Sequence, residues 1–208
     1  MDRRTFCVTG VAALSGAAAG LACLPAMSAP GIPIYRIIYD RRFCVTREFG
    51  RAARYAPSRA GTVAIDGDIT GLWSEDLRLH WSEGGGAIAG MTTARSAFCL
   101  EQLARDHWRR ALIRIEHATL DSTTVAHRIT APEPMIMRVQ SVLAAGDWPA
   151  KLPAALTDGL LADRTNADFA SMNFASADRA PRAARLTAST RDLQRAMPQE
   201  SLVTFVIA

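Results

Sequence analysis

Lysine is almost absent from this chain. Lys151 is the only lysine among 208 residues, so nearly all of the 24 basic residues are arginine, set against 20 acidic residues. The arginines are dispersed and form no basic stripe interleaved with aromatic side chains, which would be typical of a nucleic-acid-binding protein. The formal net charge of +4 is therefore spread over the sequence and does not mark a binding patch. We expect no nucleic-acid partner.

Motifs that hold cofactors are also missing. The chain has no Cys-x-x-Cys, haem-attachment or histidine-rich segment, which argues against covalent haem and against zinc sites of the usual spacing. No glycine-rich fingerprint follows the first predicted strand, where residues 40–43 read Asp-Arg-Arg-Phe, so a Rossmann-type NAD or FAD site is not expected. There is no Gly-x-Ser-x-Gly elbow for a hydrolase serine. The sequence predicts no recognisable cofactor and no metal.

Cysteines are few, and two of the four, Cys7 and Cys23, lie near the N-terminus. Cys44 and Cys99 could form one disulfide in an oxidising compartment. Both lie in stretches with amphipathic helical patterning, which favours buried free thiols instead. Whether they can meet depends on the order of the strands, which the sequence leaves open.

The first 28 residues are typical of an export signal. Arg3 and Arg4 are followed by Phe6 and by an uncharged run rich in Ala and Gly over residues 8–26, which is the pattern of a secretory signal peptide. The stretch Asp-Arg-Arg-Thr-Phe at residues 2–6 resembles the twin-arginine (Tat) motif of bacterial exported proteins. The resemblance implies that the Tat translocase carries the chain across the membrane already folded. An ordinary secretory signal is the alternative.

The same segment is not expected to remain in a membrane. Small residues dilute its apolar run at Gly10, Ser15, Gly16 and Gly20, whereas a membrane-spanning helix needs about 20 predominantly apolar residues. Cleavage after Ser28 would leave residues 29–208 as a single domain in the periplasm or outside the cell, with no stable membrane span.

Predicted strands and helices alternate between residues 33 and 118. The strands are expected at 34–39, 62–65, 87–91 and 111–115, and apolar residues recur at helical spacing between them, as at Ala97, Leu100, Ala104 and Trp108. This alternation is typical of βαβ units with a parallel sheet. We therefore predict an α/β fold: a three-layer domain with a mainly parallel sheet of about five strands.

The second half of the sequence has weaker patterning. Residues 125–129 predict a strand paired with the preceding one, and helices are expected over 135–145 and from 149 to 161. Residues 164–199 are rich in Ala, Ser, Asp and Arg, and predict a loop with one short helix near 190–197. The apolar residues 202–207 predict a buried closing strand.

Polar side chains follow the four predicted strands of the first half. In open α/β sheets ligands bind outside the carboxyl ends of the strands, so we expect these groups to share one edge. An arginine and a helix N-terminus there suit an anion. The ligand-binding candidates are Asp40, Arg41, Asp66, Thr92 and Thr93, and the catalytic candidates are Asp68, His117 and Glu116.

Each of these groups also has a simpler explanation. Asp68 and either threonine of the pair at 92–93 are good helix N-caps. Glu116 and His117 are neighbours, so on a strand their side chains point to opposite faces. His117 would need a carboxylate from another strand to act as an acid or base; otherwise it is a structural histidine.

The five residues Asp66-Gly67-Asp68-Ile69-Thr70 follow an apolar strand. They resemble Asp-x-Asp-x-Thr, the first motif of haloacid-dehalogenase-like phosphotransferases. The resemblance implies a nucleophilic Asp66, a general acid at Asp68, Mg²⁺ bound nearby and a later hydroxyl at Thr92. The family's later motifs have no match, since Lys151 is the sole lysine and lies outside any strand end.

Together these patterns favour an exported accessory or small-ligand-binding protein. Export in the folded state commonly serves cofactor enzymes and their companions, which suggests co-export with a redox partner in the periplasm. The alternative is a small periplasmic enzyme, hydrolase-like or phosphatase-like, that acts on an anionic substrate at the carboxyl edge of the sheet.

Overall fold

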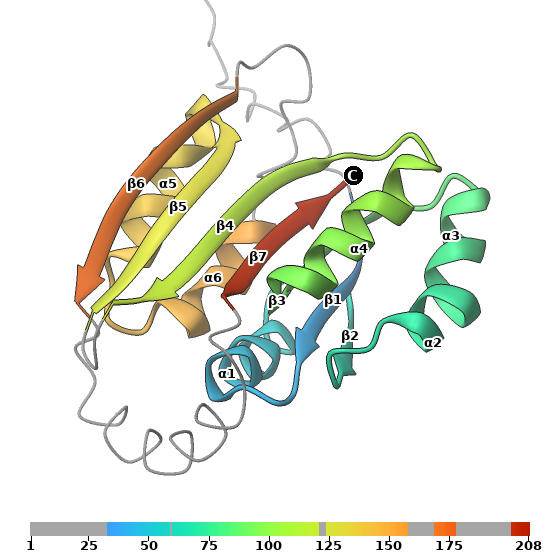
Figure 1. The fold of residues 1–208 in the computed structure, drawn as a ribbon, viewed down its shortest axis with the longest axis horizontal. Helices are drawn as coiled ribbons and strands as arrows, with labels where there is room; N and C mark the ends of the chain where they lie inside the picture. The colour runs from blue at the N-terminus through green and yellow to red at the C-terminus, as the bar shows by residue number, and fades with distance from the viewer. Residues whose placement is uncertain (1–32, 59, 121–123, 158–168, 178–200) are drawn as a thin grey trace, which may run out of the picture.

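A computed structural model describes residues 33–58, 60–120, 124–157, 169–177 and 201–208. Within these residues seven strands form one sheet in the order β2-β1-β3-β7-β4-β5-β6 (Figure 1). The α/β class is confirmed. The prediction of a mainly parallel sheet of about five strands is wrong, because the sheet is larger and mixed. The predicted signal segment and the predicted helix near 190–197 lie outside the described residues.

The elements follow the predicted order. The strands are β1 (Ile34–Asp40), β2 (Gly61–Ile65), β3 (Ala87–Thr93), β4 (Ala111–Thr119), β5 (Thr124–Pro132), β6 (Phe169–Ala177) and β7 (Leu202–Ile207). The helices are α1 (Cys44–Ala53), α2 (Thr70–Leu72), the π-helical turn η1 (Trp73–Leu77), α3 (Arg78–Ser82), α4 (Ala94–Arg105), α5 (Glu133–Leu143) and α6 (Trp148–Thr157). Among the described helices, none is long and apolar enough to cross a bilayer.

The sheet is mixed because of its last strands. β1 pairs in parallel with β2 and β3, as expected for βαβ units. β7 inserts antiparallel between β3 and β4, and β5 and β6 each run antiparallel to the preceding neighbour. Consequently β1, β2, β3, β4 and β6 run in one direction, and their carboxyl ends lie at one edge of the sheet.

β6 corrects the prediction of a loop over residues 164–199. It pairs with β5 along its whole length, from Thr124 opposite Ala177 to Pro132 opposite Phe169. Its sequence, Phe-Ala-Ser-Met-Asn-Phe-Ala-Ser-Ala, is poor in large branched side chains. Main-chain hydrogen bonds to β5 make these residues a strand. Such bonds leave no hydrophobic periodicity in the sequence, so the pattern does not predict it.

Two apolar cores on opposite faces of the sheet give the three layers. The first lies under α1, α5 and α6 and includes Ile37, Phe49, Ile113, Val139 and Leu152. The second lies under η1, α3 and α4 and includes Leu77, Trp81, Leu100, Val203 and Phe205. Figure 1 shows α4 crossing in front of the central strands with α1 behind them.

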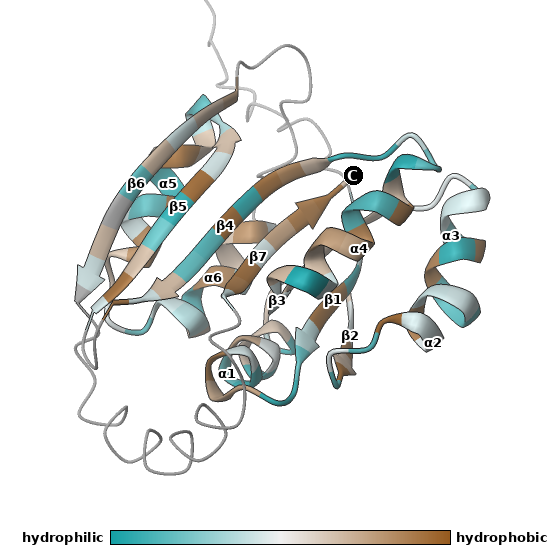
Figure 2. Cartoon of the chain, in the orientation of Figure 1, coloured by the Kyte–Doolittle hydropathy of each residue, from teal (hydrophilic) through white to brown (hydrophobic). Residues whose placement is uncertain are grey.

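The second face is covered only in part. Over β5 and β6 no described helix packs on it, and β4 meets α4 there through the Arg114–Glu101 ion pair. The outward side chains are mainly polar or small, with Phe169, 43% exposed, as the large exception. Figure 2 shows hydrophilic positions along β4 and β5. Side-chain contacts place Arg114, Glu116 and Arg128 together on this face, and Thr130 beside Ser171. We call this surface the open face. Half of the sheet therefore has one face in contact with solvent in the described part of the chain.

Three sequence-based expectations about single side chains fail. No disulfide joins Cys44 to Cys99, and the expected burial fails because Cys44 is half-buried and Cys99 is exposed. They lie on α1 and α4, which cover opposite faces of the sheet. Trp108 was expected to face inward and is 98% exposed, because α4 ends at Arg105 and Trp108 lies in the following turn with a left-handed φ of 58°.

Candidate functional site

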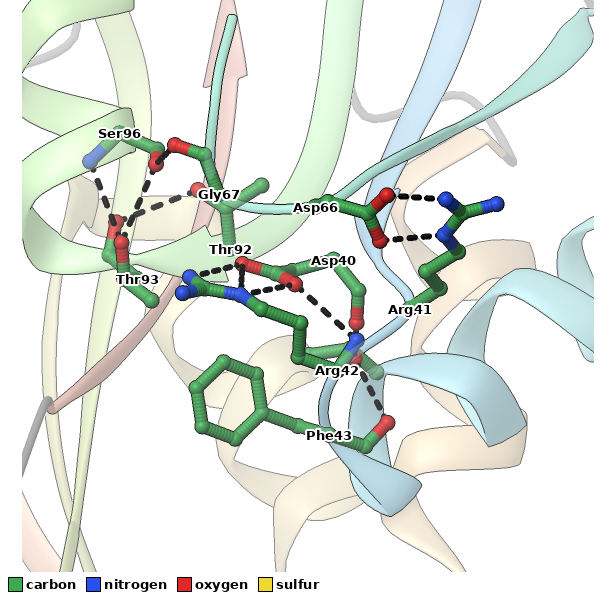
Figure 3. Close-up of polar contacts among 10 residues, drawn as sticks. Asp40, Arg41, Arg42, Phe43, Asp66, Gly67, Thr92, Thr93 and Ser96 are labelled. Carbon is green, nitrogen blue, oxygen red and sulfur yellow. Dashed lines mark hydrogen bonds and ion pairs between the residues drawn. The ribbon is translucent and has the colours of Figure 1, made fainter. Parts of the chain in front are cut away.

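Three of the predicted polar groups lie at one edge of the sheet (Figure 3). Asp40 ends β1, Asp66 follows β2, and Thr93 ends β3. Asp40 is level with Ile65, and Tyr39 is level with Met91, so the three strands finish together. The structure thus places Asp40, Arg41, Asp66, Thr92 and Thr93 side by side, where the parallel pairing of β1 with β2 and β3 requires them.

Asp40 is fully buried and holds Arg42. Its carboxylate accepts hydrogen bonds from Arg42 Nε at 2.9 Å, from Arg42 Nη2 at 2.7 Å and from the Arg42 main-chain N at 3.1 Å. The guanidinium lies across Gly67, where an added Cβ would come within 2.3 Å of Arg42 Nη2. Gly67 also has a φ of +84°. Arg42 therefore joins the chain after β1 to the turn after β2.

Arg41 and Asp66 form a second, exposed ion pair. Arg41 Nε donates to one carboxylate oxygen of Asp66 and Arg41 Nη2 donates to the other. These hydrogen bonds hold the pKa of Asp66 below its usual value and raise the pKa of Arg41. The fork-shaped pairing seen here is the geometry with which arginine binds carboxylates in general. We expected Arg41 to bind an anionic ligand, but its positive charge is already paired with Asp66.

Thr93 and Ser96 occupy the N-terminus of α4. Thr93 Oγ1 accepts a hydrogen bond from the Ser96 main-chain N at 3.3 Å, and Ser96 Oγ donates to the Gly67 carbonyl at 2.8 Å. Thr92 Oγ1 donates to the Thr93 carbonyl at 3.2 Å. All three side chains are buried. The capping explanation thus describes Thr93, and Ser96 joins α4 to the turn after β2.

The two aspartates of the phosphotransferase-like motif do not assemble a magnesium site. Asp68 Oδ1 accepts from Thr70 N at 2.9 Å and from Thr70 Oγ1 at 2.7 Å, contacts that lower the pKa of Asp68. Asp66 is bound to Arg41 and follows β2, the last strand on its side of the described sheet. No group of three or more His, Cys, Asp or Glu side chains in the described residues can hold a metal ion. We derive no step through Mg²⁺.

The three catalytic candidates lie apart. Glu116 is on the open face and pairs with Arg114 at 3.2 Å and Arg128 at 3.4 Å. His117 points to the opposite face, as the alternation along a strand requires, and is only 5% exposed. Asp68 accepts hydrogen bonds from Thr70 in the turn before α2, at the other end of the sheet order. The structure does not bring Asp68, Glu116 and His117 into one site.

The partner of His117 is another histidine. His127 lies directly opposite it in the β4–β5 pair, and their Nδ1 atoms are 2.8 Å apart. His117 Nε2 is 2.9 Å from Thr204 Oγ1 on β7, and His127 Nε2 is 2.7 Å from Ser176 Oγ on β6. None of the four residues is more than 5% exposed. They form a buried chain of hydrogen bonds across four neighbouring strands, which we call the histidine chain.

Trp148, the first residue of α6, encloses the histidine chain. Its ring stacks on His117 at 4.7 Å between centroids and meets the edge of His127 at 5.2 Å. Burial lowers the pKa of His127 to about 4, and burial together with the neighbouring imidazole lowers that of His117 well below its ordinary value. Both rings are neutral at pH 7, so one Nδ1 donates a proton and the other accepts it.

Sequence reasoning identified His117 and missed its partners. A signal for His127 was present: if residues 111–115 and 125–129 form a hairpin, positions 117 and 127 face each other near its turn. Ser176 had no such signal, because the segment that contains it lacks strand periodicity. Thr204 lies in the predicted closing strand, whose neighbours the sequence does not specify.

The open face carries a shallow concavity of about 370 Å³ over β4, β5 and β6. Its floor consists of the small side chains of Ala118, Ala126 and Ala175, and its rim includes Glu116, Arg128 and Asn173. Arg128 Nε donates to Asn173 Oδ1 at 3.2 Å. A volume of this size is near the lower limit of small-ligand sites in proteins, which begin at about 300 Å³.

Comparison with known protein families, curated proteins and solved structures finds no match to this chain.

Proposed function

We propose that this protein is an exported accessory or binding protein that holds a small polar ligand on the open face of β4, β5 and β6. The observation that carries the proposal is the concavity with an alanine floor and a charged rim. Antiparallel sheets commonly leave one face in water, and a hollow of this volume on such a face is large enough for a small ligand.

The side chains of the concavity suggest the kind of ligand. The Arg128 side chain is 62% exposed and its contact with Glu116 is long, at 3.4 Å. Exposed ion pairs of this kind contribute about 0–1 kcal/mol, so a ligand carboxylate can replace Glu116 at little cost. The three alanines offer a flat apolar floor beside this charge. A small molecule with one anionic group and a flat apolar body fits both features.

The polar groups at the strand-end edge are already bound to one another, which favours the open face over this edge as the place for a ligand. Asp40 is bound by Arg42, Asp66 by Arg41, and Thr93 caps α4. Each group holds one loop to the next, which is a structural role. Export and the twin-arginine route rest on residues 1–28, and so does an accessory role beside a co-exported redox partner in the periplasm.

The proposal is tested by native mass spectrometry of protein recovered from the periplasm of cells that make it with its own signal. We expect a mature chain that begins at Ala29 with a small adduct that disappears on denaturation. Ala175→Trp fills the concavity and should abolish the adduct. Ala64→Trp is the matched control, because Ala64 is an exposed strand alanine on β2, and it should retain it.

Other outcomes distinguish an accessory protein that binds a partner from a protein that binds a small ligand. A larger protein that accompanies the mature chain would support the accessory role beside a partner. A bare mature mass, with neither adduct nor companion in the wild type, would overturn both forms. An adduct that survives Ala175→Trp would overturn the location on the open face.

A further inference from the structure

The histidine chain has the geometry of a nucleophile, a base and a group that orients the base. Ser176 Oγ is 2.7 Å from His127 Nε2, within the range for proton transfer from a hydroxyl to an imidazole. On its other side, His127 Nδ1 is 2.8 Å from His117 Nδ1. His117 is fixed in turn by Thr204 at 2.9 Å and by the stacked ring of Trp148.

Two arrangements of protons satisfy the contacts of the four ring nitrogens, one the reverse of the other, and the reaction uses the one in which the serine is the donor. Ser176 O–H donates to His127 Nε2, His127 Nδ1–H donates to His117 Nδ1, and His117 Nε2–H donates to Thr204 Oγ1. Neither ring carries a charge in this arrangement. It leaves the bare Nε2 of His127 facing the serine hydroxyl, which is the tautomer that a general base requires.

The position of Ser176 in the sheet suits a reactive group. It is the last residue but one of β6, which runs in the same direction as β4 and therefore ends at the same edge as Asp40 and Thr93. This is the edge at which open α/β sheets bind their ligands. Ser171, on the same strand, faces the other way and pairs with Thr130 Oγ1 at 3.2 Å.

We propose that Ser176 is a nucleophilic serine, with His127 as its general base and His117 as the positioning residue, and that it takes small activated acyl or phosphoryl esters. His127 is also among the residues that line the concavity, but the Ser176–His127–His117 contacts do not depend on a ligand bound there. With an ester, Ser176 Oγ bonds to the acyl carbon and its proton passes to His127 Nε2. The C–O bond to the alcohol then breaks, and the alcohol leaves with that proton. Water hydrolyses the acyl-serine by the reverse transfer.

In the part of the chain that the structure describes, the side chains shown in contact with the pair are uncharged. Thr204 from β7, Ser176 from β6 and Trp148 from α6 make these contacts. The nearby charges on α6, Asp147 and Lys151, form their own ion pair at 2.8 Å. His127 therefore stays neutral at rest and is available as a base throughout the neutral range.

The test is covalent labelling of the mature protein by a small alkyl fluorophosphonate, chosen for its size because Ser176 is 5% exposed. Ser176 Oγ bonds to phosphorus, the P–F bond breaks, and fluoride leaves while the proton goes to His127. We expect one adduct per chain by intact mass and its location on Ser176 by peptide mapping. Ser176→Ala should abolish the adduct, and Ser171→Ala, the control on the same strand, should label as the wild type does.

The roles of His127 as base and of His117 as positioning residue are tested by the rate of labelling and by its dependence on pH. His127→Gln should slow labelling by about 100-fold or more. In the wild type the rate should stay level between about pH 5.5 and about pH 8.5, because the base is deprotonated throughout. His117→Asn keeps an acceptor for His127 Nδ1–H and should retain this level profile, whereas His117→Leu should lose it.

Three results would overturn the proposal. These are no adduct on the folded wild type, an adduct mapped to a residue other than Ser176, or a rate that rises about tenfold per pH unit, as for a serine without a base. Peptide mapping and the pH profile use the wild-type protein, so they decide the question even where Ser176→Ala fails to fold.

Discussion

The imidazoles of His117 and His127 face each other across β4 and β5, and their Nδ1 atoms are 2.8 Å apart in a buried site. Each strand contributes one ring, and the outer nitrogens reach hydroxyls on β7 and β6. A single short contact thus lies at the centre of a polar network that joins four strands. Its energetic consequences can be measured independently of any activity.

The first prediction concerns stability and pH. Burial lowers the pKa of His127 to about 4, whereas the unfolded chain binds its proton near the ordinary value of 6.5. Between these values the unfolded state holds more protons, so stability is full above about pH 6.5 and falls as the pH drops towards 4. The loss from His127 alone is about 3 kcal/mol, and His117 adds to it in the same direction.

Urea denaturation at pH values across this window measures the effect. The control is His127→Gln, which removes one of the two titrating groups and should reduce the dependence to the part that His117 contributes, at the cost of lower stability at neutral pH. A wild-type free energy of unfolding that stays constant from pH 7 to pH 4 would show that the two rings are not buried as a neutral pair.

The second prediction concerns Gly67. Its φ of +84° and the guanidinium of Arg42 above it both exclude a side chain. Gly84 has a similar φ of +78°, but an added Cβ there meets no atom within 4 Å. Gly84→Ala should therefore cost only the backbone strain, about 1 kcal/mol, and Gly67→Ala should cost at least about 1 kcal/mol more. Thermal melts of the two variants give the comparison, and equal losses would contradict the close approach of Arg42.

The third prediction separates the two ion pairs at the strand-end edge. Asp40 is fully buried and its carboxylate lies 2.7 Å from Arg42 Nη2, so Asp40→Asn removes the charge of a buried ion pair and should destabilise the fold by about 3 kcal/mol. Asp66→Asn removes the exposed partner of Arg41 and should leave the melting temperature unchanged within error. The order of the two effects should not change with added salt, since salt weakens exposed pairs most.

Local patterning accounts for much of the fold. The strands β1, β2, β3, β4 and β7 were predicted from short apolar runs, and the edge that collects Asp40, Asp66 and Thr93 follows from the alternation of strands and helices. Direction could not be predicted for β7, because all of Val203–Ile207 is buried and such a run fits a parallel or antiparallel neighbour equally well. Its insertion between β3 and β4 depends on pairing over more than 80 residues.

In the candidate site too, local features could be predicted from the sequence, whereas contacts that depend on strand pairing could not. Thr93 was recognisable as a cap, because a cap depends only on neighbouring residues, whereas Ile69, the N-cap residue of α2, provides no side-chain cap. The histidine chain was not recognisable, since His117, His127, Ser176 and Thr204 come from four strands and meet only through register. Two of these strands, β6 and β7, had no predicted partner, so no spacing in the sequence could bring Ser176 next to His127.

The last prediction concerns export, which depends on residues outside the described structure. If the twin-arginine route operates, replacing Arg3 and Arg4 together by Lys should retain the precursor in the cytoplasm, although the segment keeps its charge and its apolar run. Recognition would then require the guanidinium groups themselves, which lysine does not reproduce. An ordinary secretory signal needs only positive charge before its apolar run, so the double variant would still be exported and cleaved. Cell fractionation with detection of precursor and mature masses separates the two routes, and a mature periplasmic product from the double variant would exclude the twin-arginine one.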